Sequence, residues 1–189
     1  LESVSAYSPP CGLYWLASSS PVTSTAQEKV WTAIAGGNST LFLAPTGSGK
    51  TLAAFLWCIN RLMFESVPEK MQRCRVLYIS PLKALAIDVE RNLRVPIRGN
   101  PHAAQRLGSD FGVPVGGNRS RDTPARERAR FARNPSDMLM TTPESLYLLL
   151  TSNARETLRS VDTVIVDEIH ALVPGKRGVH LALSLERLH

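Results

Sequence analysis

Ala44-Pro45-Thr46-Gly47-Ser48-Gly49-Lys50-Thr51 is the stretch that decides the fold, and it joins an apolar run to a segment with helical periodicity. Its small residues let the backbone curl so that several N–H groups point at an anion. Lys50 adds a positive charge for the outer phosphates of a nucleotide, and Thr51 offers a hydroxyl to Mg²⁺. The general pattern has glycine at the position of Ala44. A chance Gly/Ser turn before a helix is the alternative interpretation.

The context of this loop favours phosphate binding over a chance turn. The pattern requires a strand before the loop and a helix after it. Leu41-Phe42-Leu43 predicts a strand at 40–44, and apolar spacing predicts a helix from Lys50 to about Phe64. The sequence therefore predicts a nucleoside triphosphate site. Its expected ligands are Thr46, Gly47, Ser48, Gly49, Lys50 and Thr51.

A second chemical signal follows an apolar run at 161–166, which predicts a buried strand that ends in Asp167-Glu168-Ile169-His170. Nucleotide hydrolysis needs a carboxylate to hold Mg²⁺ and a second group to orient or deprotonate the attacking water. Asp167 and Glu168 suit these two roles. A solvated strand end is the alternative, but the pairing with Lys50 favours catalysis.

Composition sets the class of protein. The chain has 189 residues, of which 43% are hydrophobic and 20% charged, so we expect one globular domain. No apolar run approaches the roughly 20 residues that span a bilayer. The formal charge of +6 favours a polyanionic partner such as nucleic acid. Three cysteines without metal-ligand or redox spacing indicate free thiols in a reducing compartment, for which we expect the cytoplasm.

Strands alternate with helices along most of the chain, which predicts a mostly parallel sheet covered by helices on both faces. The expected helices lie at 25–35, 50–64, 83–93, 143–150 and 178–188, and the expected strands at 40–44, 76–79, 138–140 and 161–166. Residues 1–24 are rich in Ser and Pro and predict a poorly ordered leader before a domain at 25–189. A strand near Val113 would be irregular because of Pro114.

Five blocks of the sequence occur in a telling order: 44–51, 80–93 (SPLKALAIDVERNL), 122–130 (DTPARERAR), 141–150 (TTPESLYLLL) and 166–172 (VDEIHAL). Together they resemble the first motor domain of a superfamily-two DEAD/DEAH-type helicase, and most closely the large helicase-related (Lhr-type) family. The resemblance covers about residue 25 to the last residue. It implies a RecA-like three-layer α/β/α P-loop domain that uses ATP and Mg²⁺ to move on DNA, from 3′ to 5′.

The resemblance also assigns roles that the residue chemistry supports. Gln27 matches the glutamine that reads the adenine edge, with an amide that donates and accepts at once. Lys50 and Thr51 match the groups that hold phosphates and Mg²⁺, Asp167 matches the metal-supporting acid, and Glu168 matches the activator of water. His170 would couple the nucleotide site to the strand-binding surface. From position alone, Gln27 could equally be an exposed helix residue and His170 a structural one.

Nucleic acid is expected across the carboxyl ends of the sheet, where the loops after successive strands gather. The first contact candidates follow two of the predicted strands and are Pro81, Leu82, Lys83, Thr142, Pro143 and Glu144. A helix start after each strand presents backbone N–H groups to phosphate. Single-stranded DNA is the expected partner, bound through its backbone and therefore sensitive to salt. A basic run that could extend this surface comprises Arg119, Arg121, Arg126, Arg128, Arg130 and Arg133.

The chain departs from the family pattern in three ways. Arg121 stands where the family usually has glycine before Asp122-Thr123, and the leader does not match the usual start. The chain also stops at His189, before the third helicase motif and the second motor domain. In this family that domain supplies an arginine finger, which is worth about a thousandfold or more in rate. We therefore expect weak ATP binding, poor hydrolysis and no unwinding by this chain alone.

Three other interpretations stay open at this stage. The chain could be an ATP-gated nucleic-acid-binding fragment without hydrolysis, or a decayed or truncated product without activity. A different ATPase family with the same loop is the third, although the Ile169-His170 ending and the Thr142-Pro143-Glu144 block argue against it.

Overall fold

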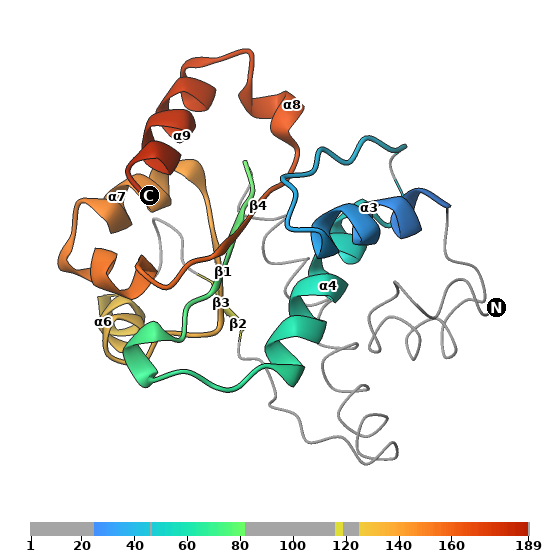
Figure 1. Cartoon of the computed structure of the whole chain (residues 1–189). Helices are drawn as coiled ribbons and strands as arrows, with labels where there is room; N and C mark the ends of the chain where they lie inside the picture. Colours follow the sequence, from blue (N-terminus) through green and yellow to red (C-terminus); the bar gives the residue numbers. More distant parts are fainter. Residues whose placement is uncertain (1–24, 46, 82–115, 119–124, 189) are drawn as a thin grey trace. The chain divides into compact units, whose positions relative to one another are not determined.

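The computed structural model describes residues 25–45, 47–81, 116–118 and 125–188, and the chain divides into two units (Figure 1). Unit 1 comprises Leu1–Ser66 and Asn92–Val113, and unit 2 comprises Val67–Arg91 and Pro114–His189. Several expectations lie outside the described residues: the leader at 1–24, Thr46, Leu82, Lys83, the helix at 83–93, the irregular strand near Val113, and Arg119 and Arg121.

Two helices make up the described core of unit 1. Helix α3 spans Thr25–Ala35 and α4 spans Lys50–Phe64, as the apolar spacing predicts. Trp31 of α3 is 1% exposed, packs with Ala53 and Leu56 of α4, and donates from Nε1 to the carbonyl oxygen of Ala53 at 2.9 Å. Because a buried indole N–H needs an acceptor, this bond fixes one helix on the other as well as satisfying the ring.

The strand expected at 40–44 does not form, so that prediction is wrong. The backbone there is irregular, and the side chains of Leu41 and Leu43 are 68% and 78% exposed. A strand exists only by pairing with a neighbour, and a short apolar run does not supply one. The helix expected after the phosphate loop is present, whereas the strand expected before it is not.

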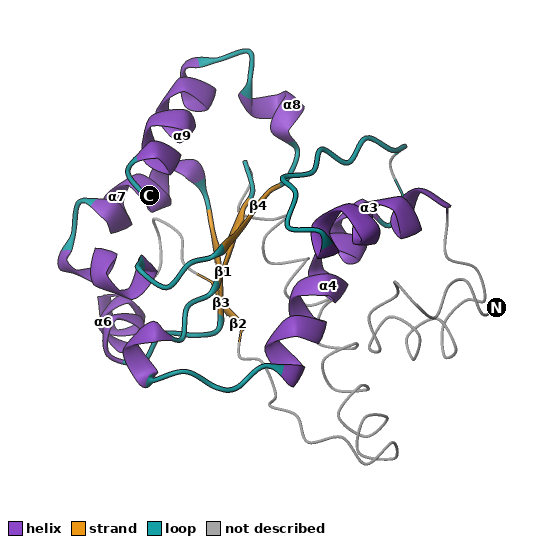
Figure 2. Ribbon diagram, viewed as in Figure 1, coloured by secondary structure: helices purple, strands orange, loops and turns teal. Residues whose placement is uncertain are grey.

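Four parallel strands form the sheet of unit 2, in the order β2-β3-β1-β4. Their bounds are Val76–Ile79 for β1, Gly116–Asn118 for β2, Met138–Thr141 for β3 and Thr163–Val166 for β4. Strand β1 lies between β3 and β4, with Ile79 opposite both Thr141 and Val166. The predicted parallel sheet is therefore confirmed, and Figure 2 shows its strands side by side.

Helices of unit 2 cover one face of this sheet. Helix α7 (Pro143–Leu150), the 3-10 helix η2 (Asn153–Leu158), α8 (Ile169–Leu172) and α9 (Lys176–Glu186) contribute leucines that pack on Leu77, Ile79 and Leu139. Thr142 caps α7 by accepting a hydrogen bond from the N–H of Ser145, and Pro143 occupies the first turn, where its missing N–H costs nothing. A second 3-10 helix, η1 (Lys70–Gln72), precedes β1, and α6 (Ala125–Arg133) precedes β3.

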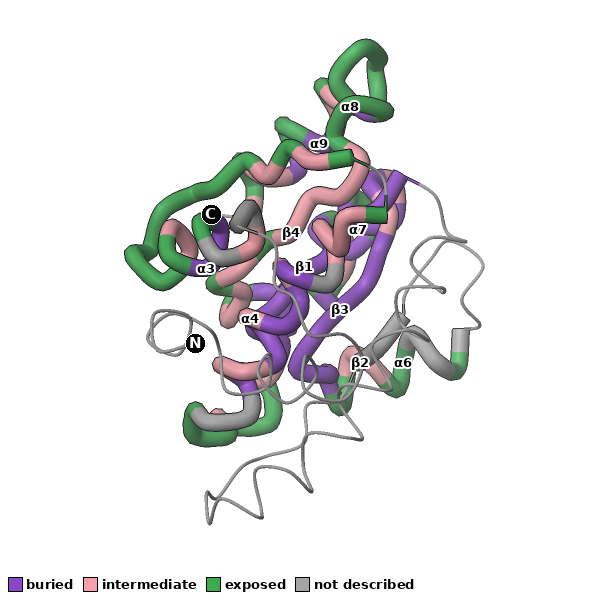
Figure 3. The backbone as a smooth tube through the Cα atoms, turned by 90° about the vertical axis from the view of Figure 1, so that its right-hand side faces the viewer, coloured by how far each residue is buried: buried purple, intermediate pink, exposed green. Residues whose placement is uncertain are grey.

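Burial differs between the strands. All residues of β1 and β3 are buried, which fits their continuous apolar sequences, whereas the residues of β4 are intermediate or exposed (Figure 3). The expectation of a buried strand at 161–166 is thus correct for its existence and wrong for its burial. None of the described helices is long and apolar enough to cross a membrane.

Candidate nucleotide and nucleic-acid sites

The loop before α4 has the backbone that phosphate binding requires. Gly47 and Gly49 have φ values of 81° and 77°, in the region that only glycine adopts without strain. Gly49 is the N-cap of α4 and makes no side-chain cap, so the helix begins without a side chain covering its first N–H groups. The hydroxyl of Ser48 is buried and has no hydrogen-bond partner among the described residues. An anion at this helix start would meet donors rather than carboxylates.

Lys50 is bound by its own loop. Its Nζ donates to the carbonyl oxygens of Ala44 at 2.6 Å and Pro45 at 2.9 Å. An ammonium group makes up to three hydrogen bonds, and two of them here hold the loop closed on itself. The charge expected for the outer phosphates is therefore present, but it is engaged with backbone oxygens.

Gln27 lies against the phosphate loop. Its Nε2 donates to the carbonyl oxygen of Ser48 at a long 3.5 Å, and a Cβ at Gly49 would lie 2.8 Å from the same nitrogen. Gln27 precedes Trp31 by four residues, so both side chains extend from one face of α3. The Trp31 contact with Ala53 fixes α3, the helix that carries Gln27, against α4.

Asp167 follows β4, and both of its carboxylate oxygens accept hydrogen bonds. Oδ2 accepts from the hydroxyl of Tyr78 at 2.6 Å, and Oδ1 accepts from the N–H of Glu168 at 2.9 Å. Tyr78 is 1% exposed in β1, opposite Ile165 of β4. Burial and then the bond to Asp167 raise the pKa of Tyr78 far above its usual value, so the hydroxyl stays a donor. The carboxylate is thereby fixed before any ligand arrives.

Glu168 has the only positive φ among the described non-glycine residues, with φ 49° and ψ 42°. This left-handed conformation costs about 1–2 kcal/mol for a residue with a Cβ, and such strain concentrates at functional sites. The Glu168 carboxylate lies 3.1 Å from Nε2 of His170, whose side chain is 79% exposed. The structure therefore brings Asp167, Glu168 and His170 together at one turn between β4 and α8.

The nucleic-acid candidates that the structure describes also lie together. Ile79 of β1 and Thr141 of β3 are paired in the sheet, so Pro81 and Thr142 leave neighbouring strand ends. Of the basic run, Arg126, Arg130 and Arg133 are exposed on α6.

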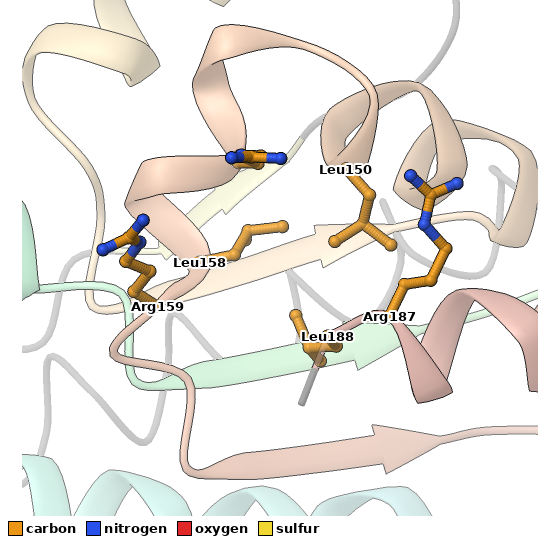
Figure 4. Close-up of a pocket in the computed structure, with 6 residues that line it drawn as sticks. Leu150, Leu158, Arg159, Arg187 and Leu188 are labelled. Atoms are coloured by element: carbon orange, nitrogen blue, oxygen red, sulfur yellow. The ribbon is translucent and has the colours of Figure 1, made fainter.

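No three His, Cys, Asp or Glu side chains within the described ranges gather in a metal-binding group. Mg²⁺ in nucleotide sites takes most of its ligands from phosphates and water, with one or two protein oxygens. A fixed carboxylate such as Asp167 fits that donor set. A separate cavity of about 300 Å³ in unit 2 is lined by three leucines and three arginines and contains none of the predicted residues (Figure 4). These are Leu150, Leu158, Leu188, Arg155, Arg159 and Arg187.

Three residues that the sequence analysis did not select contact either the selected residues or the helices that carry them. Trp31 holds the helix of Gln27, Tyr78 donates to Asp167, and Arg177 of α9 donates to both Glu144 and Pro81. The one local signal was the four-residue spacing between Gln27 and Trp31. Tyr78 and Asp167 are 89 positions apart, and only the strand register brings them together.

Comparison with known proteins places this geometry in a family. Residues 24–189 match the family described as DEAD/DEAH box helicase. The chain is 57% identical over 174 residues to a protein named Lhr helicase/probable uracil glycosylase from Mycolicibacterium smegmatis, covering 92% of this chain and 12% of that protein. It is 45% identical to an ATP-dependent helicase Lhr-Core from Methanocaldococcus jannaschii, covering 81% of this chain and 18% of that one.

Solved structures agree with this assignment. The structure of Mycobacterium smegmatis helicase Lhr bound to ssDNA and AMP-PNP matches with a TM-score of 0.85 and 56% identity, over 92% of this chain and 22% of that one. The DEAD-box helicase Mss116 matches at 17% identity with a TM-score of 0.75, which shows the RecA-like fold alone. The chain spans about an eighth of its first curated relative. The chain belongs to the DEAD/DEAH box helicase family, and within it is similar to the Lhr-type helicases.

Proposed function

We propose that this chain is the ATP-binding first motor domain of an Lhr-type DNA helicase, within a domain at 25–189. The observation that carries the proposal is the phosphate loop at the start of α4, with its two left-handed glycines, Lys50 and the buried Ser48 hydroxyl. The AMP-PNP named for the similar Mycobacterium smegmatis structure supports the same ligand class.

The predicted site residues of unit 1 each have a proposed role in holding the nucleotide. The backbone N–H groups of residues 46–51 bind the phosphates, and Lys50 exchanges the carbonyls of Ala44 and Pro45 for the outer phosphates. Gln27 is placed by Trp31 to read the adenine edge.

Asp167 and Glu168 of unit 2 have the proposed roles in hydrolysis. Mg²⁺, when bound with ATP, would neutralise the phosphate charge, with Asp167 and the Thr51 hydroxyl as its protein ligands. Glu168 accepts a proton from the attacking water as its oxygen bonds to the γ-phosphorus and the bond to ADP breaks. His170 contacts the Glu168 carboxylate and is the proposed link to the strand-binding surface.

Single-stranded DNA is the proposed partner of the edge formed by Pro81, Thr142, Pro143 and Glu144, and the proposal also includes Leu82 and Lys83 as contact residues. Thr142 and Pro143 begin α7, whose N-terminus favours a phosphate oxygen. The ssDNA named for the similar Lhr structure supports this class of partner. Contacts to the backbone predict binding that weakens steeply with salt.

Two further features of the proposal concern location and turnover. A cytoplasmic location fits Cys58 and Cys74, which are buried and form no disulfide. Burial raises the pKa of Cys74 to about 12, so its thiol is inert. We propose little turnover by this chain alone, because a second motor domain supplies the arginine finger in the family it resembles.

Equilibrium binding of a fluorescent ATP analogue with Mg²⁺ tests the proposal. The chain and its Lys50→Ala variant are compared with and without single-stranded DNA at low salt. We expect saturable binding that weakens about a hundredfold or more in the variant, because a charge-assisted contact to phosphate is lost. Lys29→Ala, at an exposed position of α3, serves as the matched control and retains binding.

The outcomes separate the competing interpretations. Binding lost in Lys50→Ala supports the motor-domain assignment, and the absence of phosphate release then identifies a fragment that binds without turnover. Failure of both proteins to bind would overturn the proposal and leave an inactive product.

A further inference from the structure

Arg177 makes two hydrogen bonds to two different segments at the proposed nucleic-acid edge. Its Nε donates to Oε1 of Glu144 at 2.6 Å, and its Nη2 donates to the carbonyl oxygen of Pro81 at 2.8 Å. Glu144 lies in the first turn of α7, which follows β3, and Pro81 follows β1. One guanidinium group therefore ties together the segments that leave two neighbouring strands.

The start of α9 is fixed in a way that places Arg177. A Cβ at Gly178 would lie 2.6 Å from the carbonyl oxygen of Leu172 and 3.2 Å from the Cα of Val173, so only glycine allows this approach to the end of α8. The next turn packs on α7, where the ring centroids of His180 and Tyr147 are 4.7 Å apart. Because α9 packs against both α8 and α7, the backbone position from which the Arg177 side chain extends is fixed.

Folding stability does not account for this ion pair. The side chains of Arg177 and Glu144 are 45% and 43% exposed, and exposed pairs contribute little to the free energy of unfolding. The second bond joins α9 to Pro81, two residues after the end of β1. We therefore expect Arg177 to affect ligand binding at these two segments rather than the free energy of unfolding.

The charges of Arg177 and Glu144 suggest a role for the pair in binding nucleic acid at the proposed edge. Burial opposes ionisation of Glu144, but the hydrogen bond and charge of Arg177, with the bonds from Glu144's own backbone N–H and from Thr142, together outweigh burial and lower the pKa of Glu144. The carboxylate is therefore charged at neutral pH. A charged carboxylate beside a phosphate repels it unless a cation is paired with it. Arg177 supplies that cation with both partners in hydrogen-bonding distance.

We propose that Arg177 is a positioning residue for nucleic-acid binding, which neutralises Glu144 and holds the segment after β1 against the start of α7. The inference rests on the proposed function and deepens it. In this arrangement the backbone groups near Pro81 and Thr142 meet successive phosphates of a single strand, while Arg177 acts through Glu144 without contacting the strand.

The test is a double-mutant cycle on the affinity for a fluorescent oligo-dT strand at low salt. We expect Arg177→Ala to bind about tenfold more weakly, because an unpaired carboxylate then faces the strand. Glu144→Gln binds about threefold more tightly, since Arg177 keeps its charge. The double variant, R177A/E144Q, binds about as tightly as Glu144→Gln, whereas independent effects would leave it about threefold weaker than the parent chain. That difference is the non-additivity expected of a pair that acts as a unit.

Matched controls separate this role from simple charge loss or unfolding. Lys176→Ala removes one exposed positive charge from the adjacent position of α9 and is expected to change the affinity by less than about twofold. Thermal unfolding of each variant checks that the fold is retained.

Several results would overturn the proposal. A double variant as weak as Arg177→Ala would mean that Arg177 contacts phosphate directly, and an equal loss in Lys176→Ala would mean that only net charge matters. A parent chain that binds neither oligo-dT nor the ATP analogue would overturn the proposed function as well. A parent chain that binds both, with Arg177→Ala unchanged, overturns the Arg177 proposal alone.

Discussion

The phosphate loop of unit 1 and the acidic turn of unit 2 differ in what holds their functional groups. Lys50 donates to two carbonyls of its own loop, whereas Asp167 accepts from Tyr78 and from the N–H of Glu168. With the proposed roles, the carboxylate can keep its partners when a ligand binds, whereas the ammonium group has to exchange them. We therefore expect unit 2 to be prepared for its ligand and unit 1 to be the part that changes.

The two units also differ in packing, and the segment before the phosphate loop of unit 1 is packed less well than the sheet of unit 2. Strands β1 and β3 are buried at every residue, while the segment before the phosphate loop exposes Leu41 and Leu43 and forms no strand. Few buried contacts and exposed backbone mark regions that open at low free-energy cost. We expect unit 1 to open more readily than the sheet of unit 2.

The largest expected effect is that of Trp31→Ala. Truncating a fully buried aromatic ring costs about 3–5 kcal/mol, and here it also removes the hydrogen bond to Ala53. We expect faster amide hydrogen exchange throughout α3 and α4, with the amides of β1 and β3 still protected. Hydrogen exchange read by mass spectrometry measures both in one experiment.

Trp31→Phe is the matched control, because it keeps an aromatic ring while it loses the N–H and part of the buried ring volume. It should lower the free energy of unfolding by at least about 1 kcal/mol, but by less than Trp31→Ala. Equal loss of protection in β1 and α4 of Trp31→Ala would break the comparison, since the two units would then unfold as one.

The next effect is that of Gly178→Ala, which tests how rigid unit 2 is. The new methyl group would meet the backbone of Leu172 at 2.6 Å, so a helix must shift, at a cost of about 1–3 kcal/mol. Thermal unfolding should show a lower Tm. Gly175→Ala is the control, because its nearest neighbouring atom lies at 4.0 Å and its backbone is extended. A Tm for Gly178→Ala that equals the control would show that unit 2 yields easily.

The smallest effect is that of Tyr78→Phe, which removes one donor from Asp167 and leaves the ring. Loss of a partner to a metal-binding carboxylate typically costs about tenfold in metal affinity. We expect the ATP analogue to need about ten times more Mg²⁺ for half-maximal binding, at an unchanged affinity without Mg²⁺. Tyr147→Phe, at an exposed position of α7, should leave the Mg²⁺ requirement unchanged. The same requirement in both variants would contradict the idea of a prepared carboxylate.

Much of the fold was predictable where a local pattern matched a local cause. The run Val76–Ile79 predicts a buried strand because all four residues are apolar, and the spacing of Lys50–Phe64 predicts a helix. The prediction of a strand at 40–44 was wrong because a strand depends on a distant pairing partner, which a local apolar run does not reveal. The same limit hid Tyr78 and Arg177, whose acceptors lie 89 and 33 positions away.

The candidate site likewise has features that a local motif predicts and features that depend on the folded backbone. Sequence motifs identified Lys50, Asp167 and Glu168, because the chemistry requires those residue types in that spacing. Motifs did not indicate that Lys50 is engaged with its own loop or that Glu168 is left-handed, since both depend on backbone conformation. The roles of all these residues stay predictions until the variants above are measured.

Because Lys50 donates to the carbonyl oxygens of Ala44 and Pro45, these two oxygens compete with the phosphates of ATP for the lysine. The apparent dissociation constant for ATP equals the intrinsic constant divided by the fraction of chains in which Lys50 is released. If about one chain in a hundred is open, the measured affinity is about a hundredfold weaker than the contacts in the complex would give. The observed rate of binding would then level off at high ATP concentration, at the rate at which the lysine leaves its two carbonyls.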